Sequence, residues 1–191
     1  LYHANVSSGS SLNIQKCKDR CYVFVNQQLN CVVERPEYNQ CTLDNEQGGE
    51  LDILVENMGR LNFGGDFVEF KGITETVRLD GTVVNNWRMT GFNLTKINEL
   101  KFNKVNNGVA RRPTFYKAEF NINGEPADTF INPKGWGRGV IFVNGINIGR
   151  YWTVGPQLTL YIPKYFLRSG TNTVIVFEHE VQFETAPTMT L

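Results

Sequence analysis

The 191-residue sequence lacks the marks of several large classes of protein. No stretch approaches the ~18 consecutive apolar residues that a membrane-spanning helix requires, so we expect no membrane span. Acidic and basic residues number 19 each, so no net charge indicates binding to nucleic acid or to an anionic membrane. The only two histidines, His3 and His179, are far apart in the sequence, and no Cys-x-x-Cys pair is present. We therefore expect neither a metal site nor a cofactor.

The residues that are abundant describe a turn-rich globular protein, with 41% hydrophobic residues, 12% aromatic residues and 18 glycines. Short runs rich in β-branched and aromatic residues are each bounded by Gly, Asn, Pro or Asp, which predicts β-strands. These runs are residues 21–26, 31–35, 50–57, 76–79, 115–122, 140–144, 158–163 and 172–180. No segment carries a sustained helical period with capping residues, so we predict an all-β fold with few or no helices.

Some of these runs repeat in the same order. Residues 22–26 (YVFVN) match residues 140–144 (VIFVN), and each run is followed by a turn and a return strand. Further along, Leu54-Val55-Glu56 matches Val176-Phe177-Glu178, and between these runs residues 41–43 (CTL) match 158–160 (LTL). Two copies of one unit predict two similar antiparallel sandwiches.

The repeat places one domain at residues 1–95 and a second at residues 96–191. The boundary falls in the Asn- and Lys-rich segment 93–113. The hairpins of the two copies differ in their turns. Asn144-Gly145 predicts a two-residue type I′ turn, because both central residues of that turn need positive φ. The equivalent Asn26-Gln27 predicts a longer or irregular turn.

All four cysteines, Cys17, Cys21, Cys31 and Cys41, lie in the first quarter of the chain, and we expect two disulfides among them. Four cysteines allow three connectivities. If the first hairpin turns near Asn26, Cys21 and Cys31 fall nearly opposite each other, where their Cβ atoms could approach the ~3.5–4.5 Å of a bridge. Cys17 would then pair with Cys41.

Two glycosylation sequons, Asn5-Val-Ser and Asn93-Leu-Thr, agree with passage through a secretory compartment. We expect a secreted or lysosomal protein with glycans at Asn5 and Asn93. The chain begins at Leu1 without a basic or apolar leader. We expect that a signal peptide has been removed or lies further upstream in a longer precursor.

Six segments in collinear order carry a family resemblance over nearly the whole chain: LDILVENMGR (51–60), FKGI (70–73), DTF (128–130), GWGRG (135–139), NGINIGRYW (144–152) and GPQ (155–157). Together they resemble the C-terminal half of β-galactosidases of glycoside hydrolase family 35, the animal lysosomal and secreted group. The resemblance implies two jelly-roll domains of galactose-binding-like topology, packed against an N-terminal TIM barrel.

The resemblance also implies what the chain lacks. Retaining glycosidases place two carboxylates ~5–5.5 Å apart, and in the family both are glutamates of the barrel, a fold of ~250 residues. In this sequence Glu56 and Glu178 occupy matching positions of the two repeats, which indicates structural roles such as pairing with Arg60 or capping a turn. We therefore expect that the chain alone does not hydrolyse galactosides, and that its partner is the barrel of the same precursor.

A carbohydrate site in this chain would use Trp136, Asn147, Arg150, Tyr151 and Trp152. An indole stacks on the apolar face of a pyranose, while Asn and Arg side chains bind its hydroxyls. The interpretation that we favour is that the tryptophans fill the core and Arg150 holds a loop, because a strand buried on one face directs every second side chain inward.

The resemblance points to a second surface, a barrel-facing loop at Arg60, Asn62 and Phe63. In the family, the Asn-Met-Gly-Arg motif is followed by an aromatic residue, often tyrosine, near the surface that faces the barrel. Phe63 lacks the hydroxyl with which such a tyrosine could order the active-site mouth.

Two hypotheses follow. The chain is the non-catalytic C-terminal part of a β-galactosidase-like hydrolase, or it is a stand-alone secreted module that binds galactosides or a protein. A supporting fragment should expose a contiguous apolar patch where the barrel belongs, whereas a stand-alone module should carry charge there.

Overall fold

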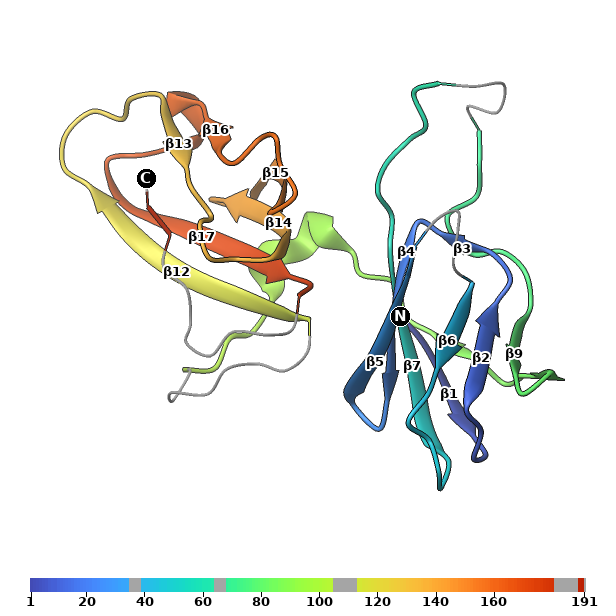
Figure 1. Ribbon diagram of the computed structural model, residues 1–191. Coiled ribbons are helices and arrows are strands. Elements are labelled where there is room, and N and C mark those ends of the chain that lie inside the picture. The colour runs from blue at the N-terminus through green and yellow to red at the C-terminus, as the bar shows by residue number, and fades with distance from the viewer. Residues whose placement is uncertain (35–38, 64–67, 105–112, 181–188, 191) are drawn as a thin grey trace. The chain divides into compact units, whose positions relative to one another are not determined.

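The computed structural model describes residues 1–34, 39–63, 68–104, 113–180 and 189–190. In this part of the chain β-strands dominate, and the helical elements are two short 3₁₀ turns, η1 (Leu94–Glu99) and η2 (Lys164–Phe166). The prediction of an all-β fold with few helices is confirmed. The chain divides into two compact units, Leu1–Phe92 and Asn93–Leu191 (Figure 1).

The first unit is a sandwich of two antiparallel sheets. One sheet has the strand order β11-β1-β7-β4-β5 and the other has the order β10-β9-β2-β6. Their bounds are β1 (Tyr2–Val6), β2 (Ser11–Ile14), β4 (Arg20–Val25), β5 (Gln28–Glu34), β6 (Gln40–Thr42), β7 (Gly49–Glu56), β9 (Val77–Leu79), β10 (Thr82–Val83) and β11 (Arg88–Met89). Buried side chains from both sheets, such as Leu12, Val23 and Ile53, meet in one core. A separate short pair joins β3 (Cys17–Lys18) to β8 (Gly72–Ile73).

The second unit is also built from two antiparallel sheets. Its larger sheet has the order β12-β17-β14-β15, and β13 pairs with β16 in the smaller one. Their bounds are β12 (Thr114–Ile122), β13 (Thr129–Ile131), β14 (Arg138–Val143), β15 (Ile146–Trp152), β16 (Leu160–Ile162) and β17 (Gly170–Glu178). Ile131 and Ile162 of the smaller sheet pack with Ile141 and Val176 of the larger one.

The two units share one strand plan. In chain order, β1, β2, β4, β5, β6 and β7 correspond to β12, β13, β14, β15, β16 and β17. The pairings β1–β7, β4–β7, β4–β5 and β2–β6 recur as β12–β17, β14–β17, β14–β15 and β13–β16. The first unit then continues with β8 to β11. The repeat in the sequence therefore reflects a repeated sandwich.

The two hairpins turn in the same way. Asn144 and Gly145 have φ of 50° and 83°, which confirms the predicted two-residue turn. Asn26 and Gln27 have φ of 47° and 70°, so the prediction of a longer turn there is wrong. The Asn26 side chain holds this conformation, because its Oδ1 accepts from Glu50 N at 3.0 Å and its Nδ2 donates to Gly48 O at 3.4 Å.

The strand register corrects the proposed equivalence of Glu56 and Glu178. Glu56 lies opposite Arg20, whereas Glu178 lies opposite Gly139. The register shifts of the two hairpins follow Val23 and Ile141, so these two residues are equivalent, and Cys21 is then equivalent to Gly139. Val55 lies opposite Cys21 and is therefore the counterpart of Glu178. A shift of one residue moves a side chain to the other face of a strand. The two glutamates therefore occupy different environments.

The disulfides are Cys17–Cys21 and Cys31–Cys41, and not the pairs expected from the hairpin. A register shift between Val23 and Phe24 places Cys31 opposite Val23 and Cys21 opposite Val33. Cys21 and Cys31 are thus diagonal neighbours, roughly 7–8 Å apart in an antiparallel pair, which is too far for a bridge.

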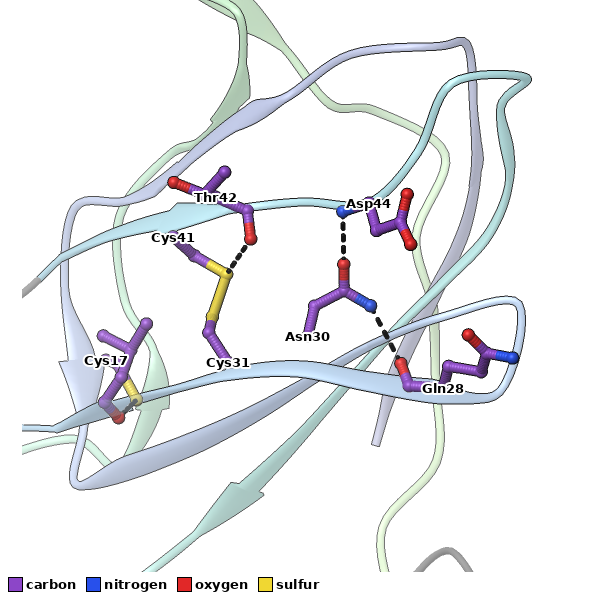
Figure 2. Close-up of a disulfide and its surroundings, with 8 residues drawn as sticks. Cys17, Gln28, Asn30, Cys31, Cys41, Thr42 and Asp44 are labelled. Carbon is purple, nitrogen blue, oxygen red and sulfur yellow. Dashed lines mark hydrogen bonds between the residues drawn. A yellow bond between two sulfur atoms is a disulfide. The ribbon is translucent and has the colours of Figure 1, made fainter.

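The bridge Cys31–Cys41 joins β5 to β6, one strand from each sheet of the first unit. Figure 2 shows Asn30 beside it, whose Oδ1 accepts from Asp44 N at 2.6 Å and whose Nδ2 donates to Gln28 O at 3.0 Å. This part of β5 is therefore tied to β6 by a covalent bond and to the segment that follows β6 by a hydrogen bond.

Candidate functional site

The second unit contains a cavity of about 360 Å³. It is lined by Asn132, Pro133, Lys134, Gly135, Trp136, Tyr151, Trp152, Thr153, Gln157 and Leu158. These residues come from the end of β15 and from the loops that follow β13 and β15. Three of the five predicted carbohydrate-binding residues therefore lie together at one cavity: Trp136, Tyr151 and Trp152.

The aromatic residues of the cavity also belong to the core. Trp136 is only 7% exposed and packs edge-to-face on Tyr116, with 5.2 Å between the ring centroids. Tyr151 is 5% exposed and donates its hydroxyl to Glu178 Oε2 at 2.8 Å. The guanidinium carbon of Arg138 lies 3.8 Å from the ring centroid of Trp152. Each aromatic residue is thus held in place from within the sandwich.

Two of the polar side chains at the cavity, Asn132 and Gln157, are hydrogen-bonded to nearby backbone. Asn132 Oδ1 accepts from Lys134 N at 3.1 Å, and Gln157 Nε2 donates to Thr159 O at 3.0 Å. These bonds stiffen the loops and leave the aromatic and apolar groups as the main lining. A pyranose would be bound there chiefly by its apolar face.

Asn147 and Arg150, the other two predicted residues, are exposed on β15 and do not line this cavity. Asn147 Oδ1 accepts from Gly149 N at 2.9 Å and so shapes the bulge of the hairpin. Arg150 lies one position before the buried Tyr151, so the two side chains point to opposite faces of the strand. Sequence reasoning missed Asn132, Pro133 and Leu158, although they flank segments that carried the family resemblance.

Below the cavity, Glu178 is 1% exposed and accepts four hydrogen bonds. Gly137 N and the Tyr151 hydroxyl bind Oε2 at 3.0 and 2.8 Å, while Arg138 N and Glu180 N bind Oε1 at 3.0 and 2.8 Å. Burial raises the pKa of Glu178, although the four donors act in the opposite direction. This carboxyl group anchors the Gly-rich loop to the end of β17.

A different surface lies in the first unit, in the segment that connects β7 to β8. We call it the apolar loop and define it as residues 57–63 and 68–71. Figure 1 shows it leaving the sandwich beyond the ends of the strands. Phe63 and Val68 are each 90% exposed, Phe70 is 84% exposed and Met58 is 40% exposed. The predicted residues Arg60 and Asn62 are exposed as well.

The second half of the apolar loop has inverted polarity. Val68 and Phe70 point to solvent, while the side chains of Glu69 and Lys71 between and after them are only 7% and 18% exposed. An ordinary surface segment directs its apolar side chains inward and its charges outward. The inversion leaves two large apolar side chains in water and two charged side chains largely shielded from it.

The inward charges form a compact network at the base of the apolar loop. Lys71 Nζ lies 2.9 Å from both oxygens of Asp19 and 2.6 Å from Glu69 Oε1, and Lys18 Nζ lies 3.1 Å from Glu69 Oε2. Burial lowers the pKa of Lys71, but the hydrogen bonds and negative charges of Asp19 and Glu69 raise it, and the net shift is upward. Lys71 is therefore held in its charged form.

The remaining predicted residues are placed as follows. His3 Nδ1 lies 2.8 Å from Asp52 Oδ1, and His179 is buried against the ring of Phe177. Asn5 and Asn93 are exposed, and Asn93 Oδ1 accepts from Thr95 N and Oγ1. Among the described residues, no cluster of His, Cys, Asp or Glu could hold a metal ion. No helix in this part of the chain is long and apolar enough to cross a membrane.

Two family models match the chain. The model described as "Beta-galactosidase, first all-beta domain" matches residues 1–94, and the one described as "Beta-galactosidase, galactose-binding domain" matches residues 113–172. The first match spans the whole first unit, and the second spans β12 to β16 and the start of β17.

Similar curated proteins bear related names. "Beta-galactosidase 17" of Arabidopsis thaliana is 37% identical over 91% of this chain and 29% of its own length. "Beta-galactosidase-1-like protein" of Mus musculus is 39% identical over 78% of this chain and 24% of its own length. "Beta-galactosidase" of Bos taurus is 35% identical over 85% of this chain and 28% of its own length. The chain thus spans less than a third of each of these relatives.

A solved rhamnosidase from Novosphingobium sp. PP1Y aligns with 94% of this chain and 18% of its own, at a TM-score of 0.31 and 11% identity. A likeness at this level carries no argument.

Proposed function

Because the chain belongs to the β-galactosidase family and carries two of its β-domains, we propose that it supports a TIM-barrel catalytic domain that lies outside this chain. In this proposal the barrel supplies the two catalytic carboxylates, and this chain covers apolar barrel surface and shapes the substrate entrance. The length of the relatives supports it, because more than two thirds of each extends beyond the match.

The observation that carries the proposal is the inverted polarity of the apolar loop. Leaving Phe63, Val68 and Phe70 in water forgoes roughly 1.5–3 kcal/mol of burial for each side chain. A supporting fragment should expose apolar side chains where the barrel belongs, as these three residues are exposed, whereas a stand-alone module should carry charge there. Here the neighbouring charges, Glu69 and Lys71, are turned away from the patch.

The test begins with the transcript that encodes this chain. We expect it to encode a barrel with two suitably placed glutamates. The barrel and this chain, produced as separate polypeptides, should then bind each other. The triple variant F63S/V68S/F70S should weaken that binding at least tenfold, while the control M89S, which changes another exposed apolar residue at 69% exposure, should bind normally. A transcript without a barrel, or equal binding by both variants, would overturn the proposal.

We also propose that the protein is secreted or lysosomal and carries glycans at Asn5 and Asn93. The two disulfides and the exposure of both asparagines support this. Intact mass before and after glycosidase treatment measures the glycans. We propose domain limits of 1–95 and 96–191, and the matches of the family models to residues 1–94 and 113–172 support them.

The cavity of the second unit supports a second candidate function, the binding of a galactoside, with Trp136, Tyr151 and Trp152 as the residues that contact the sugar. The observation in its favour is that these three aromatic residues line a cavity large enough for one pyranose ring. Calorimetric titration with galactose and lactose should give heat that the W152A variant loses and the N147A variant, changed outside the cavity, retains. Absence of heat at millimolar sugar would remove this candidate.

A further inference from the structure

Asp19 lies between β3 and β4 in the first unit, within the short loop that the disulfide Cys17–Cys21 closes. It is 5% exposed. Its backbone N donates to Glu56 O at 3.0 Å, at the last residue of β7. The preceding residue, Lys18, pairs with Gly72 of β8. Asp19 is therefore fixed between the strand that enters the apolar loop and the strand that leaves it.

The Asp19 carboxylate binds both ends of the apolar loop. Oδ2 accepts from Met58 N at 2.7 Å, at the start of the loop, and both oxygens accept from Lys71 Nζ at 2.9 Å, at its end. Charge-assisted bonds of this kind are shorter and roughly twice as strong as neutral ones. One buried carboxylate thus closes the base of the loop.

The same network accounts for the inverted polarity. Lys71 reaches inward to Asp19, and Glu69 reaches inward to both Lys71 and Lys18, so two positive and two negative side chains balance beneath the loop. Since neighbouring side chains of an extended segment alternate, drawing Glu69 and Lys71 inward turns Val68 and Phe70 outward. The inward position of the charged side chains and the exposure of the apolar ones therefore have the same cause.

We propose that Asp19 is the residue that positions the apolar loop, so that its apolar face is formed before a partner arrives. This inference rests on the proposed function for the identity of the partner, the barrel, and on the contacts of Asp19 for the positioning itself. A preformed face lowers the cost of ordering that a flexible loop would incur on binding. The described residues of the loop then dock from a fixed starting position, with Glu69 and Lys71 already paired.

The test uses the whole chain without a partner. Amide exchange of Met58 and the ¹⁹F signal of a fluorinated Phe70 report on the two ends of the loop. D19N keeps the shape of the side chain and removes its charge. We expect it to speed Met58 exchange by about tenfold or more and to narrow the Phe70 signal, while amides of β4 and β7 keep their rates. The control E75Q, which breaks the exposed ion pair between Lys16 and Glu75, should change neither signal.

K71M provides a second variant with a different expected pattern, because it removes only the contact at the end of the loop. Phe70 should become mobile while Met58 exchange stays within about twofold of the wild type. The proposal is overturned if D19N leaves both signals unchanged. It is equally overturned if D19N speeds exchange in β4 and β7 as much as in Met58, since Asp19 would then hold the sandwich and not the loop. If D19N does not fold, an unchanged Phe70 signal in K71M overturns the proposal.

These measurements separate the two proposals. If the loop loosens in D19N but the wild-type chain does not bind the barrel, the positioning role is supported and the proposed function is contradicted. If the D19N chain binds the barrel as tightly as the wild-type chain, the proposed function is supported and the positioning role is contradicted.

Discussion

At the scale of single residues, Glu178 is the most enclosed carboxyl group in the described part of the chain. All four of its partners are donors, three backbone amides and the Tyr151 hydroxyl. Desolvation nevertheless raises its pKa. A structural role for Glu178 was expected from the sequence, but its partners are two backbone amides of the Gly-rich loop, the backbone amide of Glu180 and the Tyr151 hydroxyl.

The raised pKa of Glu178 predicts how stability depends on pH. In the folded state the carboxyl group binds its proton more tightly than in the unfolded state. Between the two pKa values the folded state therefore holds more protons, and the free energy of unfolding falls as pH rises through the raised value. In E178Q this contribution should disappear, and the loss of an acceptor for Gly137 N should cost about 1–3 kcal/mol.

Chemical denaturation at several pH values between 4 and 8 measures this effect. The matched control is E119Q, which changes an exposed glutamate of β12 in the same unit. If E178Q and the wild type lose stability in parallel as pH rises, Glu178 does not titrate as described.

Residues that act together but come from distant segments escape prediction from sequence. Asp19, Glu69 and Lys71 lie up to 52 positions apart, and the pairing of β3 with β8 helps to bring them together. Phe63 was recognisable from its motif, whereas the inward turn of Glu69 was not. A side chain's direction depends on its partners across the fold as well as on its neighbours in the sequence.

At the scale of elements, strands dense in apolar and β-branched residues were predictable whether long or short, and strands with many polar residues were not. The long strands β7, β12 and β17 fall on predicted runs, because their apolar and β-branched residues are dense. The strands β1 (YHANV) and β2 (SLNI) were missed, since about half of their residues are polar. The pairing of cysteines failed for a related reason, because a bulge shifts register without a clear signal in the sequence.

The two disulfides should contribute unequally to the stability of the first unit. They close loops with sequence separations of 4 and 10 residues. The chain-entropy relation gives ~1.9 kcal/mol for the shorter loop and ~2.7 kcal/mol for the longer one. We therefore expect C31A/C41A, which also unties the two sheets, to be less stable than C17A/C21A.

Urea unfolding of the two double variants measures this difference, with the wild type as reference. The opposite order would contradict the entropic argument. It would mean that Cys17–Cys21 acts mainly in the folded state, where it encloses Asp19.

At the scale of the whole molecule, the repeat was visible in the sequence because both copies keep the hairpin and the strand beside it. Each copy has its own core: Leu12, Val23 and Ile53 in the first unit, and Ile131, Ile141 and Val176 in the second. The 3₁₀ turn η1 adds Ile97, which packs on Phe142 and Ile175 at the outer face of the larger sheet in the second unit. A domain of about 100 residues can bury enough surface to fold alone.

The two units should therefore fold separately and respond differently to reduction. Residues 1–92 and 93–191, produced as separate polypeptides, should each show a cooperative thermal transition, because each has a complete sandwich. All four cysteines lie in the first segment. A reducing agent should lower its stability by roughly 2–5 kcal/mol, and leave the second segment unchanged. Calorimetry with and without reductant provides the measurement. If the second segment fails to fold alone, or if it responds to reductant, the two sandwiches are not independent folding units. The repeat would then describe a shared strand arrangement without independent stability.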